Sequence, residues 1–274
     1  MTSYPSTPEA TGGRRKAVAG VLAAVAIIGA GIGIGSAAGG DATSTPGSPP
    51  AAVAAPNGTG NGAGGAAVPE PGGAATTTGR AVPKPLADIE AQAEDIVDKV
   101  AVGDWAAVNQ DVTTMRADWT TFGPTAGSAG VPAATAGAFT TALDRLGVAA
   151  AAQDAAGTAQ AANDASAATV EMLGRYDLGY PVEIGRLDVI GRQVVIDAGA
   201  GDFQAASGQI GQAEQQLAAA QPSLVAQGGD QVVTQTRATL VEMQRLADAR
   251  NADGLTTQAK VLLEVVDGME RLYG

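Results

Sequence analysis

The sequence predicts an all-α protein in which four helical hairpins, about eight helices, pack as antiparallel helical bundles. A single N-terminal apolar helix and a disordered linker precede them. Three observations predict this fold. From residue 86 the chain is rich in good helix formers such as Ala, Leu, Gln and Glu, its apolar residues recur every three or four positions, and aspartates recur about every 50 residues.

Residues 17–38 form the predicted apolar helix. Arg14, Arg15 and Lys16 stand directly before these 22 uncharged residues. As a helix the stretch rises about 33 Å, which is enough to cross a hydrocarbon core of about 30 Å. The three cations would keep residues 1–16 in the cytoplasm, so we expect the rest of the chain to lie outside.

Two fates of this membrane segment are compatible with its residues. Ser36, Ala37 and Ala38 provide the small side chains of a signal-peptidase site, and cleavage near Ala38 would release the protein. The length of the segment favours retention as a single-pass anchor, whereas its glycines favour cleavage. We expect a membrane-anchored protein whose C-terminal domain lies outside, with a secreted protein as the alternative.

Residues 39–85 separate the membrane segment from the helical domain. They are rich in Gly, Pro, Ala and Thr and carry too little apolar surface to offset the entropy lost on ordering. A flexible chain of about 47 residues has a root-mean-square span of roughly 40 Å. We therefore expect a disordered tether that ends where the folded domain, residues 86–274, begins.

The composition limits the chemistry of this domain. The chain contains no His and no Cys, which removes imidazole catalysis, thiol nucleophiles and the commonest transition-metal ligands. We therefore predict no enzyme and no cofactor. From residue 86 onward eleven Lys/Arg stand against twenty-five Asp/Glu, a net charge of −14. So acidic a domain repels phosphate backbones, and its few aromatic residues offer no stacking surface, which excludes nucleic acid as a partner.

Four aspartates mark an internal repeat. Asp104, Asp154, Asp202 and Asp253 lie 50, 48 and 51 residues apart. Asp is a favoured N-cap because its carboxylate accepts hydrogen bonds from the first free amides of a helix. We therefore expect a helix before each aspartate, a tight turn near it and a second helix after it.

Apolar stripes repeat together with the aspartates. In the first unit the stripes are Ile89, Ala93, Ile96 and Val100 before the turn, and Trp105, Val108, Val112, Met115, Trp119 and Phe122 after it. The third unit repeats both stripes, and the second unit is weaker after Asp154. The fourth needs a one-residue shift at Gly254 and then gives Leu255, Gln258, Leu262, Val265, Met269 and Leu272. Spacings of three and four residues place each set on one helical face.

Segments rich in helix breakers separate the four units. They cover residues 123–132, 177–181 and 221–229, which we expect to be loops. The hairpins must pack on one another because none can bury its stripe alone. The alternation of three and four favours bundles with helices crossing at about 20°, and a short α-solenoid is the alternative.

Asp188 and Arg192 are the most informative charged residues. They are four apart and therefore neighbours on one helix. One interpretation is an exposed ion pair, which stabilises a helix by about 0.3–0.5 kcal/mol. The other is a polar group buried between hairpins that fixes their register. Gly185 and Gly191 beside them would let another helix approach closely.

Candidate metal ligands are sparse. Asp154, Asn163 and Asp164 supply oxygen atoms, but no calcium-loop spacing accompanies them, so solvated or helix-pairing roles are favoured. A second acidic set lies in the first helix and suits the dipole of a helix N-terminus. It consists of Asp88, Glu90, Glu94, Asp95 and Asp98.

The function that the sequence favours is binding without catalysis. The tether, the missing catalytic groups and the repeated hairpins indicate an extracytoplasmic binding or scaffolding protein whose partner is another envelope protein. The strong negative charge supports an alternative, a carrier of cations or small ligands that uses carboxylates between hairpins.

Overall fold

The computed structural model describes residues 79–274. The predicted apolar helix at 17–38, the cleavage site near Ala38 and most of the linker lie outside the described residues. Within 79–274 the protein is all-helical, with eight α-helices and no strand, which confirms the predicted fold class and helix number. No helix in this part of the chain is both long and apolar enough to span a membrane.

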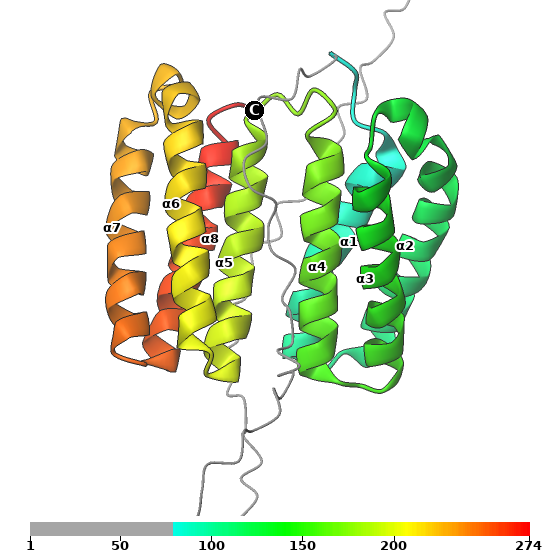
Figure 1. The fold of residues 1–274 in the computed structure, drawn as a ribbon, viewed down its shortest axis with the longest axis horizontal. Coiled ribbons are helices and arrows are strands. Elements are labelled where there is room, and N and C mark those ends of the chain that lie inside the picture. The colour runs from blue at the N-terminus through cyan, green and yellow to red at the C-terminus, as the bar shows by residue number, and fades with distance from the viewer. Residues whose placement is uncertain (1–78) are drawn as a thin grey trace, which may run out of the picture.

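The eight helices form two antiparallel four-helix bundles that stand side by side (Figure 1). The first contains α1 (Lys84–Ala101), α2 (Trp105–Ala126), α3 (Ala133–Ala151) and α4 (Ala155–Leu173), with a 3-10 turn at Gly127–Ala129. The second contains α5 (Val182–Ala200), α6 (Phe203–Ala226), α7 (Asp230–Asp248) and α8 (Ala252–Glu270). In each bundle every helix packs on the next and the last packs on the first, so each has its own closed core.

Aspartates cap the second helix of three hairpins, as their spacing predicts. The side chains of Asp104, Asp154 and Asp202 each accept a hydrogen bond from the backbone amide three residues later, at 2.9–3.1 Å. The fourth hairpin differs, because Asn251 is the N-cap of α8 and accepts from the Gly254 amide at 3.0 Å. The prediction that Asp253 marks this turn is therefore wrong by two residues, and Asp253 lies in the first turn of α8.

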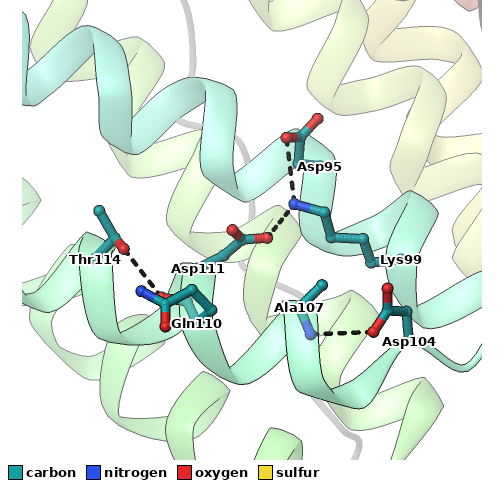
Figure 2. Close-up of polar contacts among 7 residues, drawn as sticks. All are labelled: Asp95, Lys99, Asp104, Ala107, Gln110, Asp111 and Thr114. Carbon is teal, nitrogen blue, oxygen red and sulfur yellow. Dashed lines mark hydrogen bonds and ion pairs between the residues drawn. The ribbon is translucent and has the colours of Figure 1, made fainter.

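At the turn between α1 and α2, a lysine forms ion pairs that join the two helices (Figure 2). Near the end of α1, Lys99 Nζ lies 2.5 Å from Asp111 Oδ2 on α2 and 3.4 Å from Asp95 Oδ2. The cap formed by Asp104 lies on the same turn. Lys99 thus links the two helices directly beside the point where the chain reverses.

Two of the predicted loops begin too early. α2 continues through Pro124 to Ala126, and α6 continues through Pro222 to Ala226. A proline inside a helix removes one backbone hydrogen bond. Both prolines lie within the last five residues of their helix, so a kink there disturbs only the final turn. The following turn is buried at Ala126 and Leu224, and its packing offsets the missing bond.

The predicted stripes form the two cores. Ile89, Ala93 and Ile96 are buried in the first bundle, and the corresponding Leu187, Gly191 and Val194 are buried in the second. Two residues of the predicted fourth stripe, Gln258 and Leu272, are only half-buried, whereas Ala259 and Val266 are buried. The stripe is displaced because α8 starts earlier than the aspartate spacing predicted.

The two bundles are copies of one 98-residue unit. The N-cap prolines Pro83 and Pro181, the capping aspartates and the helix prolines Pro124 and Pro222 are all 98 residues apart. From the third helix onward the offset is 97, as between the caps Asp154 and Asn251, because the loop before α7 is one residue shorter. The hairpin repeat is thus half of a longer one.

The bundles dock through α4 and α5, which lie next to each other at the centre of the molecule (Figure 1). α4 is buried almost all round, since it contributes one face to its own core and another to α5. Small residues make this possible, among them Ala161, Ala162 and Ala165. The functional site is built on this interface.

Candidate functional site

Polar side chains fill the interface between the bundles, which we call the polar seam. They come from three helices. The members are Glu90 and Glu94 of α1, Gln160, Asn163 and Ser166 of α4, and Asp188, Arg192, Gln193 and Asp197 of α5. Most of the buried polar side chains in the described residues belong to α4 and α5.

Arg192 is the centre of the polar seam. Only 9% of its side chain is exposed, and its guanidinium contacts all three helices. Nη1 lies 2.5 Å from Asp188 Oδ2 and 2.9 Å from Glu94 Oε1. On α4, Nη2 donates to Ser166 Oγ at 2.8 Å and Nε donates to Asn163 Oδ1 at 3.3 Å. Because a guanidinium has five N–H donors in a fixed plane, one side chain can hold three helices in one arrangement.

A ladder of amides continues the polar seam along α4 and α5. Gln160 and Gln193 donate to each other at 3.0 Å, and Asn163 Nδ2 donates to Gln193 Oε1 at 2.9 Å. Gln193 Nε2 also donates to Asp197 Oδ1 at 2.8 Å. An unpaired amide in such a buried position is costly, so the ladder favours one register of α4 on α5.

The other end of the interface is closed by a second ion pair. Arg186 of α5 donates from Nε and Nη2 to the two carboxylate oxygens of Glu171 on α4, at 2.7 and 2.8 Å. Beside this pair the absent side chain of Gly185 lets Val170 approach, since a Cβ there would lie 3.3 Å from Val170 Cγ1. The predicted close approach of a helix at this glycine is therefore made by α4.

Three carboxyl groups of the polar seam crowd around Arg192. Glu90, Glu94 and Asp188 each bring one oxygen to within 4.8 Å of the others. Burial, reinforced by the negative charge of Glu94, raises the pKa of both Glu90 and Asp188 well above its usual value. Burial acts on Glu94 in the same direction, but the charge of Arg192 and hydrogen bonds from Glu90 and Asp188 lower its pKa to about 2. The cluster therefore retains protons at a pH where isolated carboxyl groups are ionised.

These three carboxyl groups are, among the described residues, the one set with the spacing of metal ligands. Arg192 already supplies a positive charge to Glu94 and Asp188, so a bound cation would compete with the guanidinium. We therefore interpret the set as an ion-pair network that joins helices.

The predicted oxygen ligands do not come together. Asp154 caps α4, and at 1.5 Å rise per residue it lies roughly 13 Å along the helix from Asn163. Asn163 is buried in the polar seam, while the neighbouring Asp164 accepts from Gln160 Nε2 at 2.8 Å and lies 3.8 Å from Arg145. Asp188 and Arg192 do meet, in the buried setting that the second interpretation of their spacing describes.

Sequence reasoning missed Glu90 and Glu94, which it assigned to the dipole of the first helix. The signal that locates them is the 98-residue repeat, because Glu90 corresponds to Asp188 and Glu94 corresponds to Arg192. Equivalent residues that face each other are the mark of a two-fold axis. The two bundles are thus related by an approximate two-fold axis that passes between α1 and α5.

Comparison with known proteins found no matching family, and neither a curated protein nor a solved structure matches the chain. The functional interpretation therefore comes from the geometry of the polar seam and from the surfaces that it holds together.

Proposed function

We propose that the chain is an extracytoplasmic binding or scaffolding protein that presents two docked helical bundles to a partner in the cell envelope. The observation that carries this proposal is the position of Arg192, which bonds to α1, α4 and α5 at once. A buried network of this kind specifies one arrangement of its helices. While the bundles are docked, the network supports a platform of one shape.

The chemistry of the partner follows from charge. The domain carries a net charge of −14 from residue 86 onward, and the exposed side chains of the outer helices α2 and α6 are mostly neutral, with Glu214 and Arg116 as their exposed charged residues. A partner with basic residues would be attracted and oriented by this field. The association should therefore weaken as ionic strength rises.

The proposed location outside the cytoplasm rests on the N-terminal residues. Residues 17–38 would hold the protein in the membrane, and residues 39–85 would let the domain reach roughly 40 Å from it. Cleavage near Ala38 would release the same domain outside the cell.

Cysteine labelling tests the proposed membrane topology. The natural chain has no cysteine, so each introduced cysteine is labelled alone. Ala117→Cys, at an exposed site of α2, should react with a membrane-impermeant maleimide in intact cells. Ser3→Cys should react only after the cells are broken. Labelling of both in intact cells, or of neither, would contradict the proposed topology.

Partner binding is tested by photo-crosslinking in the native envelope. A photoreactive residue at position 117 of α2 or 215 of α6 should give one reproducible adduct that disappears at high salt. The same residue at the buried position 165 of α4 is the matched control and should give none. Adducts that are equally abundant at all three positions would contradict the proposal.

The cation carrier is the weaker alternative. Its best site in the described residues, the set Glu90, Glu94 and Asp188, already holds the guanidinium of Arg192. These three residues are better explained as part of the ion-pair network that joins the two bundles than as cation ligands.

A further inference from the structure

Polar contacts join the two bundles over much of their interface, beside a smaller apolar contact of Val170 with α5 at Gly185. Most of their buried apolar side chains form two separate cores, one within α1–α4 and one within α5–α8, and Val170 and Val189 belong to neither. The approximate two-fold axis relates the contact between α4 and α5 to a contact between α8 and α1. That second contact is much less developed, so the docking depends on the α4–α5 side. Weakening the polar seam would therefore affect the docking without disturbing either core.

The connection between the bundles contains a suitable hinge. Leu178 packs against the first core and Tyr180 against the second. Gly179 lies between them in the left-handed region, at φ +76°, where a Cβ would meet nothing within 4 Å. Upstream, the Asp177 amide donates to the Arg80 carbonyl at 2.9 Å and so ties the chain to the first bundle. Gly179, whose amide donates to Asp177 Oδ1 at 3.1 Å, is therefore the residue of this connection best able to accommodate a rotation of one bundle against the other.

The charges around the carboxyl cluster are unbalanced. From α1 they are Glu90, Glu94 and Asp98, from α5 Asp188 and Arg192, and from α8 Lys260, Asp267 and Glu270. α4 contributes only the neutral Asn163 and Ser166 to this environment. Three cations, Arg192, Lys260 and Arg271, thus face six carboxyl groups, and the docked arrangement becomes less favourable as Glu90 and Asp188 lose their protons.

We propose that the polar seam is a pH-sensitive switch, in which the bundles dock while Glu90, Glu94 and Asp188 share protons and separate about Gly179 when all three are ionised. In the docked form three oxygens lie within 4.8 Å of one another, so full ionisation places three negative charges around Arg192. Separation exposes them to water, where their repulsion is screened. Glu94 is 40% exposed, which gives protons a route from solvent to the cluster.

The raised pKa values of Glu90 and Asp188 agree with this switch. Both carboxyl groups bind their proton more tightly in the docked form than in water. Each of these groups releases its proton when the bundles separate, so a rise in pH favours separation. Between the ordinary and the raised pKa of a group, the ratio of separated to docked protein increases by up to about tenfold per pH unit for that group.

The test is a distance measurement across the molecule by pulsed electron paramagnetic resonance. Ala117→Cys on α2 and Gln215→Cys on α6 are exposed, equivalent in the repeat and the only cysteines of the full-length chain once introduced. The doubly spin-labelled protein is studied from pH 5 to pH 9 in detergent with EDTA. We expect one distance at pH 5 and a growing second population at longer distance as the pH rises.

Glu90→Gln with Asp188→Asn is the matched variant. The amides have the shape of protonated carboxyl groups and do not titrate, so the double variant should fold and remain docked at every pH. Arg192→Met is a second variant with the opposite expected effect. Loss of the guanidinium should move the separation of the bundles to lower pH. Asp197→Asn, at a neighbouring carboxyl group of the polar seam, should leave the transition in place.

Three results would overturn the proposal. They are a distance distribution that does not change between pH 5 and pH 9, a transition that persists in the Glu90→Gln, Asp188→Asn variant, and a transition that Asp197→Asn alone removes. None of these measurements involves a binding partner, so their failure is independent of the proposed function.

Discussion

Glu94 and Arg192 occupy equivalent positions in the two halves of the repeat and bind each other, with Glu94 Oε1 2.9 Å from Arg192 Nη1. At an exact two-fold axis identical residues would meet here and like charges would repel. The neighbouring side chains explain why the arginine stands on α5 and the glutamate on α1. Arg192 meets the acceptors Asn163 and Ser166 on α4, whereas the equivalent positions of α8 hold Lys260 and Leu263. The divergence of the two copies has thus produced a complementary pair.

Arg192→Met should destabilise the protein at neutral pH by roughly 3 kcal/mol. This lies at the low end of the range for breaking a buried ion pair, because Glu94 keeps 40% of its side chain exposed. The free energy of unfolding is measured by urea denaturation. Arg245→Met removes an exposed ion pair with Glu242 and is the control, with a loss of about 0–1 kcal/mol. Equal losses in the two variants would show that Arg192 is no more than a surface charge.

Gly191→Ala tests the close contact of α5 with α8. A Cβ at this position would lie 2.7 Å from Leu263 Cδ2. Gly208, in α6, is the matched control because a Cβ there meets nothing within 4 Å. Gly208→Ala should stabilise by about 0.5–1 kcal/mol through helix propensity. Gly191→Ala should be less stable than this control by about 0.5–1.5 kcal/mol, because the end of the half-buried Leu263 side chain must move aside. Equal melting temperatures would contradict the contact.

The capping assignment of α8 has its own test. Asn251→Ala should cost about 1 kcal/mol because it removes the acceptor for the Gly254 amide. Asp253→Ala should cost only about 0.3 kcal/mol, the effect of one acidic charge near a helix N-terminus. Both values come from thermal or urea unfolding. A larger loss at Asp253 would restore the position that the aspartate spacing predicted.

The helices could be predicted from the sequence because their causes are local. The capping aspartates and the stripes of three and four spacing depend on residues within a few turns of one another. Asp104, Asp154 and Asp202 therefore mark their turns correctly. Local rules place Pro124 and Pro222 in loops, because these rules count the hydrogen bond that a proline removes. The same rules do not include the tertiary packing of the next turn, at Ala126 and Leu224.

The polar seam could be predicted only in part because it is a tertiary feature. Asp188 and Arg192 share a helix, so their spacing reveals the pair. Glu94 lies 98 residues from Arg192, and nothing in its own helix shows that it faces another bundle. The weak stripe of α4 has the same origin. A helix buried on two sides needs small residues all round, and this obscures the periodicity on which the prediction relies.

The carboxyl cluster should also shape the pH dependence of global stability. The folded pKa values of Glu90 and Asp188 are raised above those of the unfolded chain, about 4.3 and 3.9. Their contribution to stability is therefore fully present below about pH 4 and is lost as the pH rises through the folded pKa values. Glu94 acts oppositely, because its pKa falls to about 2 and its contribution is lost only on acidification towards that pH.

Comparison of the wild type with Glu90→Gln, Asp188→Asn isolates the two raised groups. The wild type should lose stability relative to this variant as the pH rises above 4, by about 1.4 kcal/mol for each unit of upward pKa shift. Urea denaturation at several pH values measures the difference. Glu242→Gln, at an exposed pair with Arg245, is the control and should give a flat difference over the same range above pH 4, because the pKa of Glu242 is lowered and its contribution changes only at acid pH. A wild type that gains stability relative to the double variant as the pH rises would mean that these carboxyl groups are ionised and stabilised by Arg192, and that they share no protons.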